Sequence, residues 1–366
     1  MNIGIPKERR DLEKRVGLTP YGVDLLTRAG HMCYIETEAG LGAGFTDYHY
    51  ERVGGQMVYS GEEVYGRSDL VLKAVRPTEE ELEWLRDGQI LAGFLHLAAA
   101  RRSKIETLLE KGITAIAYET IEKGDGTLPA LRPMSEVSGR MAPQLAATCL
   151  QSNYGGRGVL LSGVPGIPPA RVAILGAGVL GTNAARAFLG TGARVHVLDL
   201  DQDRLHEIDR LYQGCVTTMV SYPFNIARVA RFAEVLVGAV LVPGARAPIC
   251  VTRKMVRSMR RGAVILDFSI DQGGCVETSR PTTLRDPVYV EEGVVHFCVP
   301  NVPGAVPRTA THAFNNAIWP YIRRIAEIGL DAAAAESPAL TRGIAIRDSE
   351  IVNEALAAAF YAGEEE

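Results

Sequence analysis

The stretch that decides the fold runs from Val172 to Asp199 and reads VAILGAGVLGTNAARAFLGTGARVHVLD. It opens with an apolar run typical of a buried strand and continues into an alanine-rich helix. Between the two stand Gly176, Gly178 and Gly181 in the spacing G-x-G-x-x-G, and a second apolar run ends at Asp199. Strand, glycines, helix and terminal acid together predict a dinucleotide-binding βαβ unit.

Each glycine has a physical task in such a unit. The first permits a tight turn, the second lets a pyrophosphate approach the backbone, and the third lets the helix pack against the strand. The helix N-terminus offers free N–H groups to the phosphates. Asp199 would accept hydrogen bonds from the adenosine ribose and repel a 2′-phosphate, which favours NAD over NADP, although Arg204 nearby softens that preference. The alternative is a tight βα turn without a ligand.

Composition excludes several classes of protein. The chain has 366 residues, enough for two domains, and a net charge of −4 that provides no basic field for nucleic acid or an anionic membrane. No apolar run approaches the roughly 18–20 residues of a membrane span. The N-terminus, MNIGIPKERR, lacks the order of a signal peptide, so we expect a cytoplasmic protein. Neither the cysteines nor the histidines have metal-ligand spacing, and we expect no metal site.

The first part of the chain alternates strand-like and helix-like segments, which predicts a parallel sheet covered by helices. The expected strands are Asn2–Ile5, Cys33–Thr37, Leu70–Val75, Ile90–Phe94 and Thr114–Tyr118. The expected helices are Pro20–Arg28, capped by Thr19, then Glu79–Arg86, Arg102–Glu110 and Ser135–Gln151.

A second series of strands follows the glycine motif. We expect them at Thr217–Val220, Val235–Ala239, Ala263–Phe268 and Val294–Cys298. The last segment, with helices at Thr311–Ile328 and Ile351–Tyr361, is too short for a domain and should return to the first part. The fold class predicted is α/β, with two doubly wound parallel-sheet domains. A Rossmann NAD-binding domain, residues 135–306, is inserted in a discontinuous substrate domain, residues 1–134 and 307–366, with a cleft between them.

Eight blocks of sequence are more specific. They read GIPKE (4–8), RVGLTP (15–20), FLHLAA (94–99), PMSEVSGRMA (133–142), GGRGVLLSGVPG (155–166), GAVLVPGARAP (238–248), IDQGGCVETSRPTT (270–283) and NVPGAVPRTAT (301–311). In this order they resemble the alanine dehydrogenase family, which is related to the NAD-binding subunit of proton-translocating transhydrogenase. The resemblance implies interconversion of L-alanine with pyruvate, ammonia and NADH, and a homo-oligomer, a hexamer in many members.

Three polar residues follow strand-like runs and suit this chemistry. His96 ends an apolar strand, where α/β sheets place ligands, and the resemblance implies that it is the general acid/base. Asp271 precedes Gln272-Gly273-Gly274, and by resemblance it lies beside substrate and cofactor. Arg15 would hold the substrate carboxylate bidentately, again by resemblance. The alternatives are a structural histidine, a turn or cap aspartate, and a solvated loop charge.

One segment departs from the family. Members carry a substrate-binding lysine in an L-K-x-K-x-P pattern, whereas this chain reads Leu72-Lys73-Ala74-Val75-Arg76-Pro77, with Val75 at the functional position. Lys73 would share the strand face of Val75, and Arg76 could reach in from the strand end, so either could replace the missing cation. Otherwise the pocket has changed and suits a bulkier amino acid, a secondary amine or a cyclic imine.

The remaining expected contacts to NAD rest on the resemblance, position by position. They are Ser135, Gly176, Gly178, Val179, Leu180, Gly181, Asp199, Arg204, Ser221, Val240, Leu241, Phe268, Ile270, Arg280, Val299, Asn301 and Val302. For the apolar members, simple packing is an equal alternative.

Three functions are therefore open. The first is an NAD-dependent alanine dehydrogenase. The second is an NAD(P)H-dependent dehydrogenase or imine reductase that acts on another amino acid or a cyclic imine, and Val75 is its motive. The third is an NAD(H)-binding module without a soluble substrate, against which the presence of both His96 and Asp271 speaks.

Overall fold

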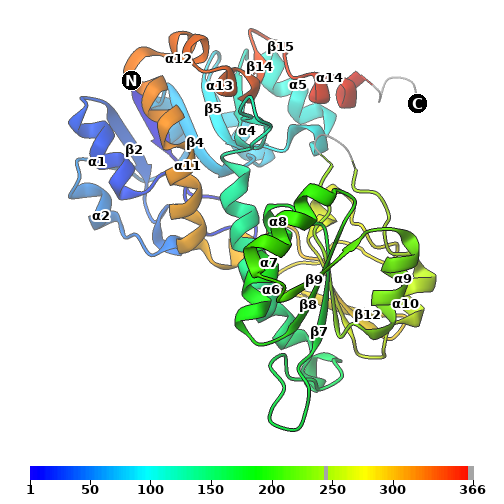
Figure 1. Ribbon diagram of the computed structural model, residues 1–366. Helices are drawn as coiled ribbons and strands as arrows, with labels where there is room; N and C mark the ends of the chain where they lie inside the picture. Colours follow the sequence, from blue (N-terminus) through cyan, green and yellow to red (C-terminus); the bar gives the residue numbers. More distant parts are fainter. Residues whose placement is uncertain (243–245, 362–366) are drawn as a thin grey trace. The chain divides into compact units, whose positions relative to one another are not determined.

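The computed structural model describes residues 1–242 and 246–361 (Figure 1). It divides the chain into two compact units. Unit 1 holds Met1–Met134 and the chain from Gly304 onward, and unit 2 holds Ser135–Pro303. The return to unit 1 falls at Gly304, ahead of the predicted residue 307, because the 3-10 helix η6 (Val302–Ala305) leads almost directly into α11 (Pro307–Ile328).

Unit 1 is built on a mainly parallel sheet. Its strands are β1 (Asn2–Ile5), β2 (Met32–Glu36), β3 (Gln56–Val58), β4 (Leu70–Val75), β5 (Ile90–Phe94), β6 (Thr114–Ala117), β14 (Ile344–Arg347) and β15 (Glu350–Ile351). The spatial order is β15-β14-β6-β5-β4-β1-β2-β3. From β3 to β6 this is the order of a doubly wound fold, whose direction of winding reverses between β1 and β4.

One edge of this sheet differs from the parallel arrangement that the sequence predicts. β14 runs antiparallel to β6, and β15 runs antiparallel to β14. Asp348 and Ser349 join the last two strands with φ of 51° and 62°, as the two central residues of a tight hairpin require. The predicted helix Ile351–Tyr361 therefore starts later, at Glu354, because its first residue belongs to the hairpin.

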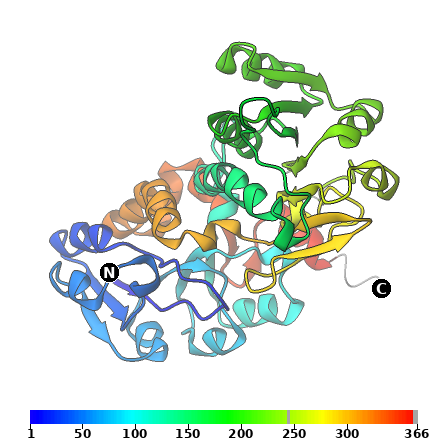
Figure 2. The same cartoon turned by 90° about the horizontal axis from the view of Figure 1, so that it is seen from below.

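The helices of unit 1 come from both parts of the chain that form this unit. They are α1 (Pro20–Arg28), α2 (Asp47–Glu51), α3 (Gly61–Arg67), α4 (Glu79–Trp84), α5 (Arg102–Glu110), α11, α12 (Leu330–Glu336), α13 (Pro338–Gly343) and α14 (Glu354–Tyr361). Thr19 caps α1 as predicted, because its hydroxyl accepts from Gly22 N at 3.3 Å. Figures 1 and 2 show α11 alongside α1, and Phe314 and Ile318 of α11 are buried in the same apolar cluster as Ile3 and Ile5 of β1.

Unit 2 repeats the winding. Its strands are β7 (Arg171–Leu175), β8 (Arg194–Asp199), β9 (Val216–Val220), β10 (Val235–Gly238), β11 (Val264–Asp267), β12 (Val288–Glu291) and β13 (Val294–Phe297). They follow the order β12-β13-β11-β10-β7-β8-β9, and only β12 is antiparallel. The six parallel strands have the Rossmann order, with the reversal between β7 and β10. The predicted fold class is confirmed, except for the antiparallel strands at the sheet edges.

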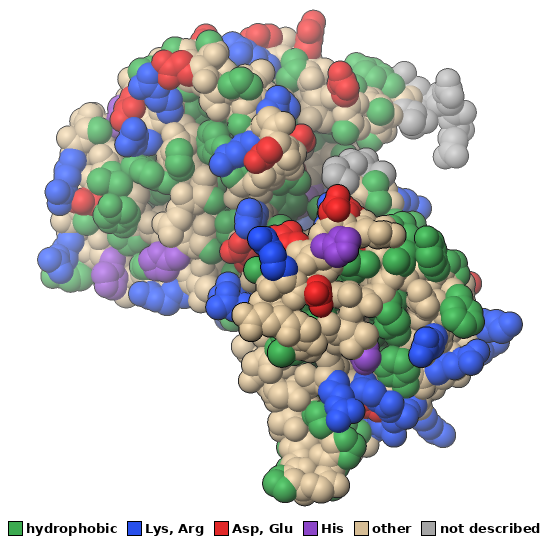
Figure 3. All heavy atoms as spheres, viewed as in Figure 1, with side chains coloured by type: hydrophobic (Ala, Val, Ile, Leu, Met, Phe, Trp, Pro, Cys, Tyr) green, Lys and Arg blue, Asp and Glu red, His purple; other side chains and the backbone are tan. Residues whose placement is uncertain are grey.

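Helices pack on both faces of the sheet of unit 2. They are α6 (Leu131–Cys149), α7 (Val179–Gly190), α8 (Gln202–Tyr212), α9 (Pro223–Phe232) and α10 (Arg253–Ser258). Lys, Arg, Asp and Glu side chains are spread over both units on the face drawn in Figure 3. Among the described residues, no helix is both long enough and apolar enough to cross a membrane.

Candidate active site

The glycine loop of unit 2 has the geometry that the three glycines predict. Gly176 has φ of 106°, a conformation that favours glycine, and a Cβ there would lie 2.4 Å from the oxygen of Ala239. A Cβ on Gly181 would lie 1.8 Å from the oxygen of Gly176, so α7 packs directly on the loop. Gly178 caps α7, and a Cβ there would meet only Arg204 Nη1, at 4.0 Å. The loop thus keeps open space beside the free N–H groups of a helix N-terminus, which fits a pyrophosphate.

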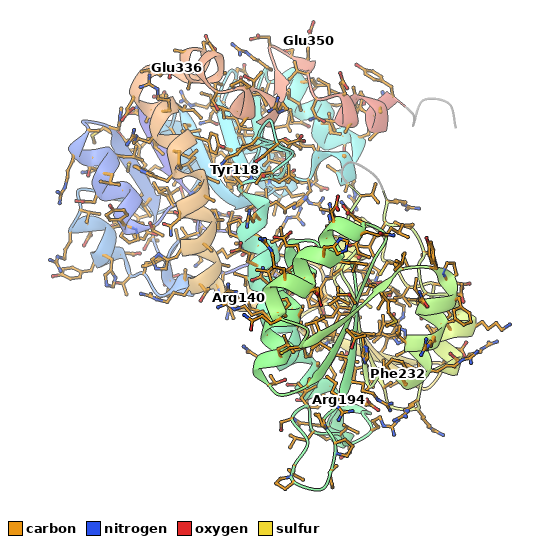
Figure 4. All side chains as sticks on the ribbon, viewed as in Figure 1. Tyr118, Arg140, Arg194, Phe232, Glu336 and Glu350 are labelled. Carbon is orange, nitrogen blue, oxygen red and sulfur yellow. The ribbon has the colours of Figure 1, made fainter. Side chains whose placement is uncertain are left out.

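Helix α6 lies against this loop. A Cβ on Gly139 would be 2.4 Å from the oxygen of Leu180, so the two helices approach backbone to backbone. Arg140 extends from α6 (Figure 4), and its Nε donates to Asn183 Oδ1 at 3.0 Å. Ser135, predicted to reach the pyrophosphate, lies one helical turn before Gly139 on the same face of α6.

Asp199 ends β8 and has a role that the sequence did not predict. Its Oδ2 accepts from Ala177 N at 2.6 Å, and its Oδ1 accepts from Asp201 N at 2.9 Å. The carboxylate therefore fixes the glycine loop. Arg204 is partly neutralised, since its Nε lies 3.4 Å from Asp201 Oδ2.

Most of the other residues predicted to contact NAD share a location. Ser221 follows β9, Val240 and Leu241 follow β10, Phe268 and Ile270 follow β11, and Val299, Asn301 and Val302 follow β13. All of these positions lie at the carboxyl ends of parallel strands, the edge where such sheets bind ligands. Arg280 is different, because its guanidinium lies 4.0 Å from the ring centroid of Tyr289 on β12.

Asp271 lies in the short 3-10 helix η5 (Phe268–Gln272) and is exposed. The loop is held by Asp267, which sequence reasoning missed. Asp267 is fully buried, its Oδ1 accepts from Ser269 N at 3.0 Å, and its Oδ2 accepts from Cys275 N at 3.0 Å. Ser269 Oγ in turn donates to the backbone oxygen of Val240 at 2.8 Å and accepts from the N–H of Val240 at 3.0 Å. The Asp267 carboxylate thus closes the loop that carries Asp271, and the Ser269 hydroxyl links this loop to Val240.

His96 has an unusual backbone in unit 1. Its φ and ψ are 44° and 48°, a left-handed conformation uncommon outside glycine. Glu119 holds this turn, because its carboxylate accepts from His96 N at 2.5 Å and from Leu95 N at 3.2 Å. The exposed imidazole stacks on Phe94, with ring centroids 6.4 Å apart and an angle of 18° between the planes. His96 and Asp271 belong to different units.

Arg15 already has an anionic partner. Its side chain is 2% exposed, and its Nη2 and Nε donate to Glu13 at 2.7 and 2.8 Å. Its Nη1 lies 3.5 Å from Met134 Sδ. Glu13 therefore holds the guanidinium through Nε and Nη2. Nη1 faces the thioether of Met134.

Lys73 lies in a buried cluster of charged side chains. Its side chain is fully buried in unit 1, with Nζ 2.9 Å from Glu8 Oε2 and 2.5 Å from Glu81 Oε1. These two carboxylates raise the pKa of Lys73 despite its burial, which favours the neutral form. Substrate binding by Lys73 stays a prediction, and this geometry does not favour it, because two carboxylates surround the ammonium within the core.

Val75 is 9% exposed, at the end of β4, and its N–H lies 3.4 Å from Glu8 Oε1. Arg76 is half-buried, and its Nη1 donates to the oxygen of Ala99 at 3.4 Å. Of the two cations proposed as replacements, only Arg76 has a side chain that reaches solvent. In the described part of the chain, no group of three or more His, Cys, Asp or Glu side chains is arranged to hold a metal ion.

Comparisons with known proteins agree with the fold and with these motifs. The family described as "Alanine dehydrogenase/PNT, N-terminal domain" matches residues 4–138, and "Alanine dehydrogenase/PNT, C-terminal domain" matches residues 142–354. Alanine dehydrogenase from Geobacillus stearothermophilus is 48% identical over 98% of this chain and 96% of its own length. The enzyme of the same name from Mycobacterium tuberculosis H37Rv is 44% identical over the same shares.

Solved structures give the same result. A structure of L-alanine dehydrogenase is 45% identical, covers 99% of both chains and superposes with a TM-score of 0.95. A transhydrogenase from Sinorhizobium meliloti is 22% identical over 97% of this chain, with a TM-score of 0.80, and shares the fold. The predicted resemblance is confirmed: this chain belongs to the alanine dehydrogenase/PNT family.

Proposed function

We propose that this chain oxidises L-alanine to pyruvate and ammonia with NAD as hydride acceptor, and also catalyses the reverse reductive amination. The observation that carries the proposal is near-complete similarity to proteins named alanine dehydrogenase, at 44–48% identity over 98% of the chain. The glycine loop and Asp199 provide the donor and acceptor groups that NAD needs.

NAD supplies the hydride acceptor, and the protein supplies binding, orientation and proton transfer. The N-terminus of α7 would hold the pyrophosphate. Ser135 would also reach it, from one helical turn before Gly139, where α6 approaches α7 most closely. Asp199 would bind the ribose of the adenosine. The residues that follow β10, β11 and β13 would line the rest of the cofactor.

His96 is the proposed acid/base. Its exposed imidazole, on a turn held by Glu119, can take a proton from the amine or from the water that adds to the imine. Arg15 is proposed to bind the substrate carboxylate through Nη1, while Glu13 fixes the guanidinium plane. Asp271 is proposed to orient the amine or water beside the nicotinamide.

The experiment is a scan of amino acids and keto acids, followed at the nicotinamide absorbance band, together with a titration of NADH fluorescence. Alanine with NAD, and pyruvate with ammonia and NADH, should give the largest change. His96→Ala should abolish turnover and leave NADH binding intact, whereas His312→Ala, which removes an exposed histidine of α11, should leave both unchanged. Loss of NADH binding in His96→Ala would contradict the proposed role.

A second candidate function follows from Val75. Val75 stands where family members have a lysine. Lys73, on the same strand face, is enclosed by Glu8 and Glu81 and does not offer its charge at that position. A more apolar pocket could take a bulkier or cyclic amino acid. Val75→Lys should lower the KM for alanine about tenfold, the value of one charge-assisted hydrogen bond. If another amino acid is oxidised faster by the parent and Val75→Lys reverses this order, the second candidate replaces the first.

We also propose a cytoplasmic homo-hexamer, as in many members of the family. The support in this chain is the loop before β7, where Leu160, Val164 and Ile167 are 60%, 52% and 64% exposed. Burial of such a patch between subunits is favourable. Light scattering of the purified protein tests the subunit number, and a monomer would contradict the proposal.

A further inference from the structure

Three cations, Arg10, Arg76 and Lys104, lie at the end of β4. Arg10 and Lys104 are not among the residues predicted to contact substrate or NAD. Arg10 Nε donates to the oxygen of Arg76 at 3.1 Å, and Lys104 Nζ lies 3.5 Å from the oxygen of Pro77. The two side chains therefore reach successive carbonyls of one turn, from the loop after β1 and from α5. This turn lies where the winding of the sheet of unit 1 reverses, the place where doubly wound folds bind ligands.

These cations lack the partners that neutralise their neighbours. Arg9 pairs with Glu36 at 2.7 Å, and Arg101 pairs with Glu79 at 3.1 Å. Within the described residues, by contrast, Arg10, Arg76 and Lys104 donate only to backbone carbonyls. Carbonyl groups hold each of these half-buried cations in place without an ion pair among the described residues.

The cluster opens into a cavity of about 650 Å³. The cavity is lined by Arg9, Arg10, Thr78, Glu79, Glu80 and Lys104. Thr78 Oγ1 accepts from Glu81 N at 3.3 Å, and the same hydroxyl hydrogen-bonds the Glu81 carboxylate, so Thr78 is used in the cap of α4. Of the two carboxylates that line the cavity, Glu79 pairs with Arg101 and Glu80 is exposed.

The electrostatics of the cluster agree with this reading. Burial and the charge of Arg76 lower the pKa of Arg10, against the opposite effect of Glu81, Glu8 and Glu13. Burial lowers the pKa of Lys104, and the charges of Arg10, Arg76 and Arg101 lower it further, against the opposite effect of Glu79. Like charges that repel one another are stabilised when an anion binds between them.

We propose that this cavity binds a phosphate group, either inorganic phosphate or a phosphate monoester, through Arg10 and Lys104, with Arg76 adding charge from the turn. Guanidinium and ammonium groups together form a common phosphate-binding set. An excess of cations favours an anion with more than one charge over the single carboxylate of alanine. The site goes beyond the proposed reaction and does not depend on it.

The test is calorimetric titration of the full chain with inorganic phosphate and, separately, with glycerol phosphate. Saturating NADH is present so that the glycine loop is blocked. We expect one saturable site with a dissociation constant of about 1 mM or tighter. Tighter binding of one titrant identifies which source of the phosphate group the site prefers. Lys104→Met and Arg10→Met should each weaken binding about tenfold or more, and Lys104→Arg should retain it.

Lys7→Met is the matched control. It removes the same charge by the same substitution, but Lys7 is exposed and already pairs with Glu38 at 2.8 Å. Its dissociation constant for phosphate should equal that of the parent. Absence of saturable heat in the parent would overturn the proposal. An equal loss in Lys7→Met, or phosphate acting as a competitive inhibitor against alanine, would overturn it as well, since the effect would then come from net charge or from the substrate pocket.

Discussion

The ammonium of Lys73 lies 2.9 Å from Glu8 Oε2, at the point where the loop after β1 crosses the end of β4. The same carboxylate accepts from Ala74 N at 2.6 Å through Oε1. Glu8 therefore joins the backbone and the side chain of one strand to the loop that continues to Arg15. The first lysine of LKAVRP is a structural residue, and its charge supports the architecture near the proposed substrate position.

Removing this charge should cost stability. Lys73→Met leaves Glu8 and Glu81 buried without a counter-ion, which typically destabilises a protein by about 3–5 kcal/mol. Urea unfolding followed by circular dichroism measures the loss. Lys7→Met, at an exposed pair, should change the free energy of unfolding by about 0–1 kcal/mol. A Lys73 variant of parental stability with a raised KM for alanine would show that Lys73 binds substrate after all.

The parts that the sequence predicts well are local. Alternating apolar runs, the cap at Thr19 and the spacing of the glycines each depend on neighbouring residues, and all of them are found in the structure. β14 was missed because it is short and pairs with β6, from which it is far removed along the chain. A single apolar run does not reveal which strand edge it will join.

The partners of charged residues were harder to predict. Lys73 is separated by 65 residues from Glu8, so its burial in an ion pair left no local pattern. Asp267 had a signal that could have been used, namely an acid that ends an apolar run ahead of a glycine-rich loop. The roles of His96, Asp271 and the NAD contacts stay predictions, although their placement at strand ends fits them.

Asp267→Asn should impair catalysis through the loop that carries Asp271. An amide keeps the volume, but its single NH2 group would face the N–H of either Ser269 or Cys275, so one of these two hydrogen bonds is lost and the loop should shift. We expect kcat to fall about tenfold to a hundredfold, as for a displacement of about 1 Å, with a smaller change in NADH affinity. Asp286→Asn, at an exposed position in the same unit, is the control. An unchanged kcat in Asp267→Asn would show that this carboxylate does not position Asp271.

Asp199→Ala should relax the choice between NAD and NADP. The substitution removes the repulsion of a 2′-phosphate and leaves Arg204 nearby, so kcat/KM for NADP should rise. The value for NAD should fall about tenfold, because the hydrogen bonds to the ribose and to Ala177 are lost. Initial rates with both cofactors measure this ratio, and Asp203→Ala on α8 is the control. An unchanged ratio would exclude Asp199 from cofactor discrimination.

Unit 2 should lose stability in mild acid. Burial lowers the pKa of His296 below its ordinary value of 6.5, and its Nε2 lies 2.8 Å from Thr278 Oγ1. A histidine with a lowered folded pKa contributes stability above the unfolded pKa of 6.5, and this contribution is lost as pH falls from 6.5 through the lower folded pKa. His196, whose pKa is also lowered by burial, acts in the same direction. The melting temperature should therefore drop less steeply from about pH 7 to about pH 5 in His296→Asn than in the parent. Equal slopes would contradict the assignment.

The antiparallel strand β14 has a consequence for the order in which the protein matures. Until Ile344–Arg347 leaves the ribosome, β6 presents an unpaired edge, while every strand of unit 2 has already been synthesised. Exposed strand edges invite pairing with other chains. The nascent polypeptide thus carries a complete inserted unit beside an unfinished sheet, and its exposure to aggregation is greatest in that interval of translation.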